Sequence, residues 1–204
     1  MLTSDEIANL PSVIIRNADE PAKIEEAISS LNDQDDRCHL LYGLTKRLLA
    51  EGELEAAEKV SRSLDTWPIE RTWFFGDIAV KRWEAGQAEH ARQLLQEAIP
   101  IARNGGVEWQ RAESLARIAV RFDLIGDRRM AVTLLAEAAE IAGRGEAQSL
   151  SRGNIQDTLD SASTLDEISA ALIAVGEPVL ARQVAGSIRH DHRRQRALAR
   201  LNSK

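Results

Sequence analysis

Apolar side chains recur along this chain with the spacing of amphipathic helices, arranged around four glycines. These glycines are Gly52, Gly86, Gly126 and Gly176. A large apolar residue lies eleven positions before each glycine and an aliphatic residue lies eight before it, so the two share one helix face. An alanine follows five positions after each glycine and an aliphatic residue eight positions after. Each unit is therefore predicted to be two helices joined at the glycine, where a left-handed backbone is often needed.

Five aligned columns of residues define this repeat. The columns at −11, −8, −7, +5 and +8 from the glycine are Leu41, Phe75, Leu115 and Leu165; Leu44, Ile78, Ile118 and Ile168; Thr45, Ala79, Ala119 and Ser169; Ala57, Ala91, Ala131 and Ala181; and Val60, Leu94, Leu134 and Val184. The small residues allow helix axes to approach closely. Because one helix pair cannot bury its apolar face alone, neighbouring pairs are expected to stack into an all-α solenoid.

The repeat resembles the tetratricopeptide repeat (TPR) over residues 36–65, 70–103, 110–143 and 162–188. Glycine spacings of 34, 40 and 50 depart from the constant spacing of that family, and its closing proline is missing, so other α-solenoids remain an alternative. The resemblance implies a right-handed α-α superhelix of about four helix pairs with capping helices. In that family the first helices of the pairs line a concave groove that receives extended peptides.

The whole chain, residues 1–204, is expected to form one TPR-like domain. Residues 1–35 are predicted to form N-terminal capping helices, and residues 36–143 to form three helix pairs. Residues 144–160 are polar and rich in glycine and serine, so they are predicted to form an irregular linker. Residues 161–204 are predicted to contain the fourth pair and a basic capping helix.

By the same resemblance, the groove is expected to be lined by the columns 13, 10, 6 and 3 positions before each glycine. The candidate partner-binding residues in these columns are His39, Tyr42, Lys46, Trp73, Val80, Trp83, Glu113 and Asp123. Aromatic side chains on a concave surface are typical anchors for a partner. The alternative is that the tryptophans pack in the core.

A basic column comprises Arg37, Arg71 and Arg111, at the start of the first helix of three pairs. These arginines could form ion pairs with acids of neighbouring second helices. Alternatively, they could form a ridge that recognises carboxylates of a ligand. In the family, a set of Lys, Asn and Arg side chains clamps a peptide's terminal carboxylate, and only Lys46 has a counterpart here.

The distribution of charge adds a second hypothesis. The net charge is −6 and the isoelectric point about 5.3, which argues against nucleic-acid binding. Residues 1–36 carry a net charge of −7, whereas residues 189–204 carry +5. A self-assembling scaffold subunit that associates weakly through these ends is therefore the alternative to a protein-interaction module that binds a peptide or partner protein.

Candidate catalytic chemistry is sparse. His190 and His192 lie two positions apart and diverge on a helix, so no metal site is predicted, and no cofactor motif is present. Cys38 is the single cysteine, which fits a reducing compartment. No basic leader or long apolar run is present, so we expect a cytoplasmic protein that does not enter a membrane. Because the catalytic signals are sparse, we also expect that it is not an enzyme.

Overall fold

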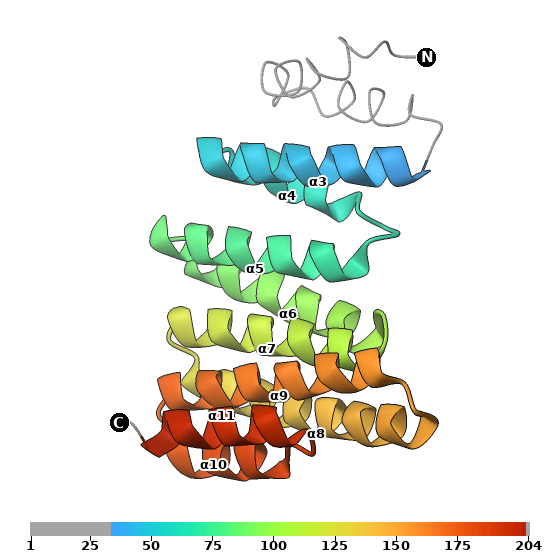
Figure 1. Cartoon of the computed structure of the whole chain (residues 1–204). Coiled ribbons are helices and arrows are strands. Elements are labelled where there is room, and N and C mark those ends of the chain that lie inside the picture. Colours follow the sequence, from blue (N-terminus) through green and yellow to red (C-terminus); the bar gives the residue numbers. More distant parts are fainter. Residues whose placement is uncertain (1–33, 203–204) are drawn as a thin grey trace.

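A computed structural model describes residues 34–202 of the chain, and these residues form α-helices without any strand (Figure 1). The first two pairs are α3 (Gln34–Glu51) with α4 (Leu54–Arg62), and α5 (Pro68–Glu84) with α6 (Ala88–Asn104). The next two are α7 (Glu108–Leu124) with α8 (Arg128–Arg152), and α9 (Ile155–Ala174) with α10 (Pro178–Ser187). A last helix, α11 (Asp191–Asn202), follows. The all-α fold class is confirmed.

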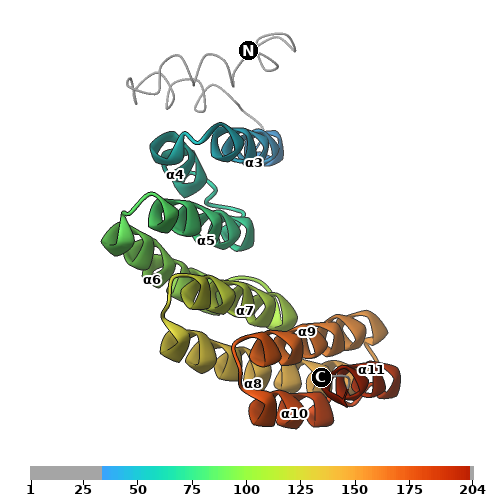
Figure 2. The same cartoon turned by 90° about the vertical axis from the view of Figure 1, so that its left-hand side faces the viewer.

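Consecutive helices pack as pairs, and the pairs stack in chain order (Figure 1). Each second helix, such as α4 or α6, also packs on the first helix of the next pair. The first helices α5, α7, α9 and α11 contact one another in series, but α3 scarcely touches α5. Figure 2 shows the first helices on one side of the stack and the second helices on the other. This is a helical-repeat arrangement; the right-handed superhelix stays a prediction.

The repeat columns form the core of this stack. Every member of the five columns is buried, and none is more than 6% exposed. Large residues such as Phe75 and Leu115 and the alanines of the second helices therefore belong to one buried core. The periodicity of the sequence correctly predicted which side chains are removed from water.

The turn glycines adopt the backbone conformation that the sequence predicted. Gly52, Gly86, Gly126 and Gly176 have φ values of 82°, 80°, 84° and 79°. The residue after each glycine donates its backbone N–H to a carbonyl of the preceding helix at 2.8–2.9 Å. This bond completes a Schellman turn, for which glycine is the preferred residue.

The predicted irregular linker at residues 144–160 is wrong, because the segment is helical. Helix α8 continues to Arg152, Gly153 makes the turn with φ 69°, and Asn154 caps α9 by accepting the Asp157 N–H. The other glycine of this segment, Gly145, allows close packing of two helices. Gly145 is buried, and a Cβ there would lie 2.8 Å from the Cβ of Glu108 on α7.

Two buried carboxylates attach α11 to the stack. Glu146 of α8 is fully buried and accepts the backbone N–H groups of Arg189 and His190 at 2.9–3.0 Å. Asp166 of α9 is 1% exposed and pairs with Arg196 and Arg200 of α11. Helix α11 thus occupies the place that the first helix of a further pair would take. Residues 1–33, predicted to belong to the N-terminal capping helices, lie outside the described residues.

No helix within residues 34–202 combines the length and the apolar character required to cross a membrane.

Candidate functional site

The first helices of the four pairs present one continuous surface, here called the inner face. It combines half-buried apolar and aromatic groups with charged ones. Its members on α3, α5, α7 and α9 are Lys46, Trp73, Asp77, Val80, Lys81, Glu84, Glu113, Ala116, Arg117, Val120, Arg121, Leu124, Thr164, Glu167 and Ala171. The predicted groove residues Lys46, Trp73, Val80 and Glu113 are among them.

A hollow of about 470 Å³ lies on the inner face between α3 and α5, with α7 at its end. We call it the α3–α5 hollow. Its lining residues are Lys46, Leu49, Ala50, Phe74, Asp77, Val80, Lys81, Glu84, Arg121 and Leu124. Leu49 and Phe74 are buried, whereas Leu124 is 60% exposed, which is unusual for a leucine in this core-forming repeat.

An aromatic cluster fills the other end of the space between α3 and α5. Trp67, just before α5, meets His39 edge-on at a ring-centroid distance of 4.7 Å and Tyr42 at 6.2 Å. Tyr42 also contacts the Phe74 ring at 5.1 Å, and the Lys46 ammonium lies 5.7 Å from the Tyr42 ring. The predicted groove residues His39 and Tyr42 therefore belong to an aromatic cluster that lies between α3 and α5.

Farther along the inner face, two arginines of α7 bridge to α5. The Arg117 guanidinium stacks over the Trp73 ring at 4.6 Å and pairs with Glu113 at 2.8 Å. Arg121 reaches Asp77 at 2.8 Å. Its side chain passes directly over Gly76, where an added Cβ would lie 3.2 Å from the Arg121 Nε. Trp73 and Glu113 are thus brought together through Arg117.

The α9 part of the inner face carries an acid whose pKa is perturbed. Burial raises the pKa of Glu167, and repulsion by the Glu113 carboxylate raises it further. The two groups line a small cavity of about 110 Å³ between α7 and α9. Arg117 and Arg121 also line this cavity, so its two acids face two basic side chains.

In the column three positions before the glycine, Leu49 lines the hollow, whereas Trp83 and Asp123 do not. Trp83 packs against the core and lies under Arg92 of α6, with 5.6 Å between the guanidinium and the ring centroid. Leu49 in the same column is 7% exposed, and Asp123 lies half-buried in the last turn of α7. For Trp83, the structure therefore shows the packing role that the sequence left as an alternative.

The sequence matches no protein-family model, and no curated protein matches it. The structure is similar to the crystal structure of Ton1535 from Thermococcus onnurineus NA1, with a TM-score of 0.55 and 13% sequence identity. The similarity covers 96% of this chain and 57% of that one, so this chain spans little more than half the length of that structure. At this level of identity the likeness concerns the fold alone.

Among residues 34–202, Arg71 and Arg111 form ion pairs with acids close to them in sequence and not with acids of neighbouring second helices. Arg71 pairs with Asp65 of the preceding loop at 3.3 Å, and Arg111 pairs with Glu108 of its own helix at 3.0 Å. Arg37 lies half-buried in α3. Different ion pairs connect the units on the outer side, where they join second helices to one another.

The outer ladder consists of the pairs Arg62–Glu97, at 2.8 Å, and Arg103–Glu137, at 2.7 Å. They join α4 to α6 and α6 to α8. The partners lie 35 and 34 residues apart, close to one repeat length. That separation is the signal by which the sequence could have revealed them.

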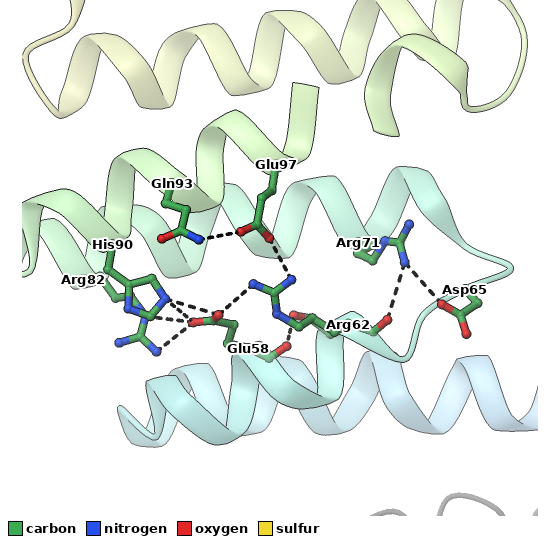
Figure 3. Close-up of polar contacts among 9 residues, drawn as sticks. Glu58, Arg62, Asp65, Arg71, Arg82, His90, Gln93 and Glu97 are labelled. Atoms are coloured by element: carbon green, nitrogen blue, oxygen red, sulfur yellow. Dashed lines mark hydrogen bonds and ion pairs between the residues drawn. The ribbon is translucent and has the colours of Figure 1, made fainter. Parts of the chain in front are cut away.

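A buried ionic network joins the first pair to the second (Figure 3). Glu58 of α4 accepts two hydrogen bonds from Arg82 of α5, at 2.8 and 3.1 Å. It also pairs with Arg62 at 3.0 Å and with His90 of α6 at 3.0 Å. Burial raises the pKa of Glu58, but hydrogen bonds from Arg62 and His90 outweigh it and hold the pKa below the ordinary 4.5. The sequence analysis missed this network.

Among residues 34–202, no group of three or more His, Cys, Asp or Glu side chains could hold a metal ion. The single cysteine, Cys38, is buried, with its Sγ 2.8 Å from the Thr66 Oγ1.

Proposed function

We propose that this chain is a protein-interaction module that binds a peptide or a helix of a partner protein on its inner face. The observation that carries the proposal is the α3–α5 hollow, where an exposed Leu124 stands beside a floor of buried apolar residues. An apolar group exposed in a concavity with polar neighbours is typical of an interface core. The TPR-like repeat and a right-handed superhelix are part of the same proposal.

Both halves of the inner face contribute to the proposed binding surface. The hollow offers apolar contact area, and the α7–α9 half offers charged side chains that are already held in place, such as Arg117 between Trp73 and Glu113. Side chains that are ordered before binding lose little conformational entropy when a partner arrives. A partner spanning both halves would therefore gain affinity from each.

The alternative function, self-assembly through oppositely charged ends, is disfavoured by the internal pairing of the basic tail. Of the six basic side chains in residues 189–204, Arg189, Arg194, Arg196 and Arg200 form ion pairs within the chain. Charges neutralised in this way contribute little to a contact with a second copy.

The proposal can be tested by capturing partners from a lysate of the native cell with the purified chain as bait. Val120→Glu places a charge on the half-buried part of the inner face, whereas Arg129→Glu changes the charge of an exposed residue on α8. We expect Val120→Glu to abolish capture of the specific partner and Arg129→Glu to leave it unchanged. Equal melting temperatures would show that both variants are folded.

Cross-linking adds a positional readout to this experiment. A photo-reactive amino acid at Val120 should yield a covalent adduct with the captured partner, and the same amino acid at Arg129 should not. Capture that resists Val120→Glu, together with adducts only at Arg129, would show that the partner binds the outer helices instead.

A further inference from the structure

The geometry of the α3–α5 hollow points to one class of occupant. We infer that it anchors a partner segment that carries a large apolar side chain flanked by acidic ones. This inference rests on the proposed function and adds to it the chemistry of the partner and the place where it is anchored.

The hollow exists because α3 lies apart from α5, the first helix of the next pair. Within the described part of the chain, the other first helices lie closer to the next one. From α5 to α11 each first helix contacts the next, and the cavity between α7 and α9 measures only about 110 Å³. Between α3 and α5, the ring of Trp67 occupies one end of the space through its contacts with His39 and Tyr42. The other end stays open as the hollow of about 470 Å³.

The surface of the hollow selects an apolar side chain. Phe74 and Leu49 are buried beneath it, Val80 is half-buried in its wall, and Leu124 is 60% exposed at its rim. Enclosing these groups under a partner's side chain would remove apolar area from water, which favours binding. The volume is sufficient for one or two large side chains of a peptide, but it is too small for a folded domain.

The charges around the hollow select acidic neighbours for that side chain. Lys46 on α3 and Lys81 on α5 are exposed on opposite walls, and neither forms an ion pair with a carboxylate among residues 34–202. The Asp77 carboxylate is already paired with Arg121 at 2.8 Å. Glu84 is the remaining acid of the lining, so the walls carry an excess of unpaired positive charge. A segment with acidic side chains on both sides of its apolar anchor complements this pattern.

The test uses the full chain and two synthetic peptides with blocked ends. One peptide has a central phenylalanine and leucine flanked by glutamates, and its companion has lysine in place of each glutamate. Binding is measured by fluorescence anisotropy and located by the methyl NMR signals of Val80 and Leu124. We expect the glutamate peptide to shift both signals and to bind about tenfold more tightly than the lysine peptide. Blocked ends ensure that side-chain carboxylates, and no terminal one, are tested.

Surface variants assign the effect to the hollow. Lys81→Glu and Leu124→Ala should each weaken binding of the glutamate peptide about tenfold, and Lys81→Arg should retain it. Arg129→Glu makes the same charge change on the outer side and should have no effect. All three positions are exposed, so the four variants are expected to fold.

Three outcomes would overturn the inference. The first is equal affinity for the two peptides. The second is an affinity for the glutamate peptide that neither Lys81→Glu nor Leu124→Ala changes. The third is association of two copies of the chain through Leu124 in place of peptide binding. The proposed function would survive the first two if the native partner were still lost on Val120→Glu, because Val120 lies outside the hollow, between α7 and α9. Loss of the native partner on Lys81→Glu would support both.

Discussion

At the scale of single residues, buried carboxylates occur where one helix pair meets the next. Glu58 of α4 holds Arg82 of α5, and Asp166 of α9 holds Arg200 of α11. A carboxylate removed from water requires such partners, because an unpaired buried charge is strongly destabilising. Each of these acids therefore fixes the position of the following unit and does not simply fill space.

Replacing Glu58 with glutamine should destabilise the chain in a pH-dependent way. The pKa of Glu58 in the folded chain is lower than the ordinary 4.5, so its contribution is fully present above that value and is lost as the pH falls through the folded-state pKa. At neutral pH, Glu58→Gln also leaves the 7%-exposed Arg82 without its ionic partner. We expect a loss of about 3 kcal/mol in the free energy of unfolding there, shrinking toward zero in acid.

Urea denaturation at several pH values would measure this difference. The matched control is Glu51→Gln, because Glu51 pairs with Arg47 on the surface, where both side chains are more than a third exposed. Its effect should stay below about 1 kcal/mol at any pH. A deficit for Glu58→Gln that is constant with pH, or that grows in acid, would contradict the assigned role.

At the scale of helices, α11 depends unusually strongly on polar contacts. Ala197 is its one fully buried side chain, with Leu198 and Leu201 packed half-buried against the core. Most of the helix is polar, so hydrophobic burial alone gives it little stability. The ion pairs of Asp166 with Arg196 and Arg200 therefore carry a large share of its attachment.

Replacing Asp166 with asparagine should loosen α11 while leaving the middle of the stack intact. The substitution removes the buried charge and with it the ion pairs to Arg196 and Arg200, so amide exchange in residues 191–202 should become at least about tenfold faster. Amides of α5 to α7 should change little. Hydrogen-exchange mass spectrometry checks both, with Asp191→Asn as the control because that carboxylate is 77% exposed. Uniform acceleration along the whole chain would show that Asp166 instead stabilises the stack globally.

At the scale of the whole molecule, the stack has unequal junctions. Units of a solenoid are stabilised by their own folding and by contact with their neighbours. The third pair is held on both inner and outer sides, since α7 contacts α5, α6, α8 and α9. The first pair is held to the second by α4 against α5, by the Glu58 network and by the aromatic cluster, because α3 and α5 approach each other mainly through rings such as Tyr42 and Phe74.

Matched core truncations should reveal this difference. Leu41 in α3 and Leu115 in α7 occupy the same repeat column, and both are 0% exposed. Each substitution by alanine should cost about 2–5 kcal/mol locally. We expect Leu115→Ala to lower the main unfolding transition, and Leu41→Ala to produce a separate, earlier transition with loss of exchange protection confined to residues 34–62. Identical, single transitions for the two variants would indicate that the junctions are equally strong.

The sequence by itself determined the helix pairs, their turns and their buried columns. These features depend on residues within one repeat, where the helical period places Leu115 and Ile118 on one face and a left-handed turn requires Gly126. The columns six and thirteen positions before the glycines place Lys46, Trp73 and Val80 on the inner face, and their role in binding a partner stays a prediction. These predictions needed only local geometry and the tendency of apolar groups to leave water.

The tertiary structure alone decided features that depend on distances between helices. Trp67 packs against His39 of α3, 28 residues before it, and the Arg121–Asp77 bridge joins residues 44 apart. Likewise, Gly145 lies within a helix, where its missing side chain leaves room for Glu108 of α7. Taken alone in the sequence, the same glycine favours a turn. A repeat pattern records which faces are apolar, but not how closely neighbouring faces approach, because that spacing is set by the volumes of side chains distant in sequence.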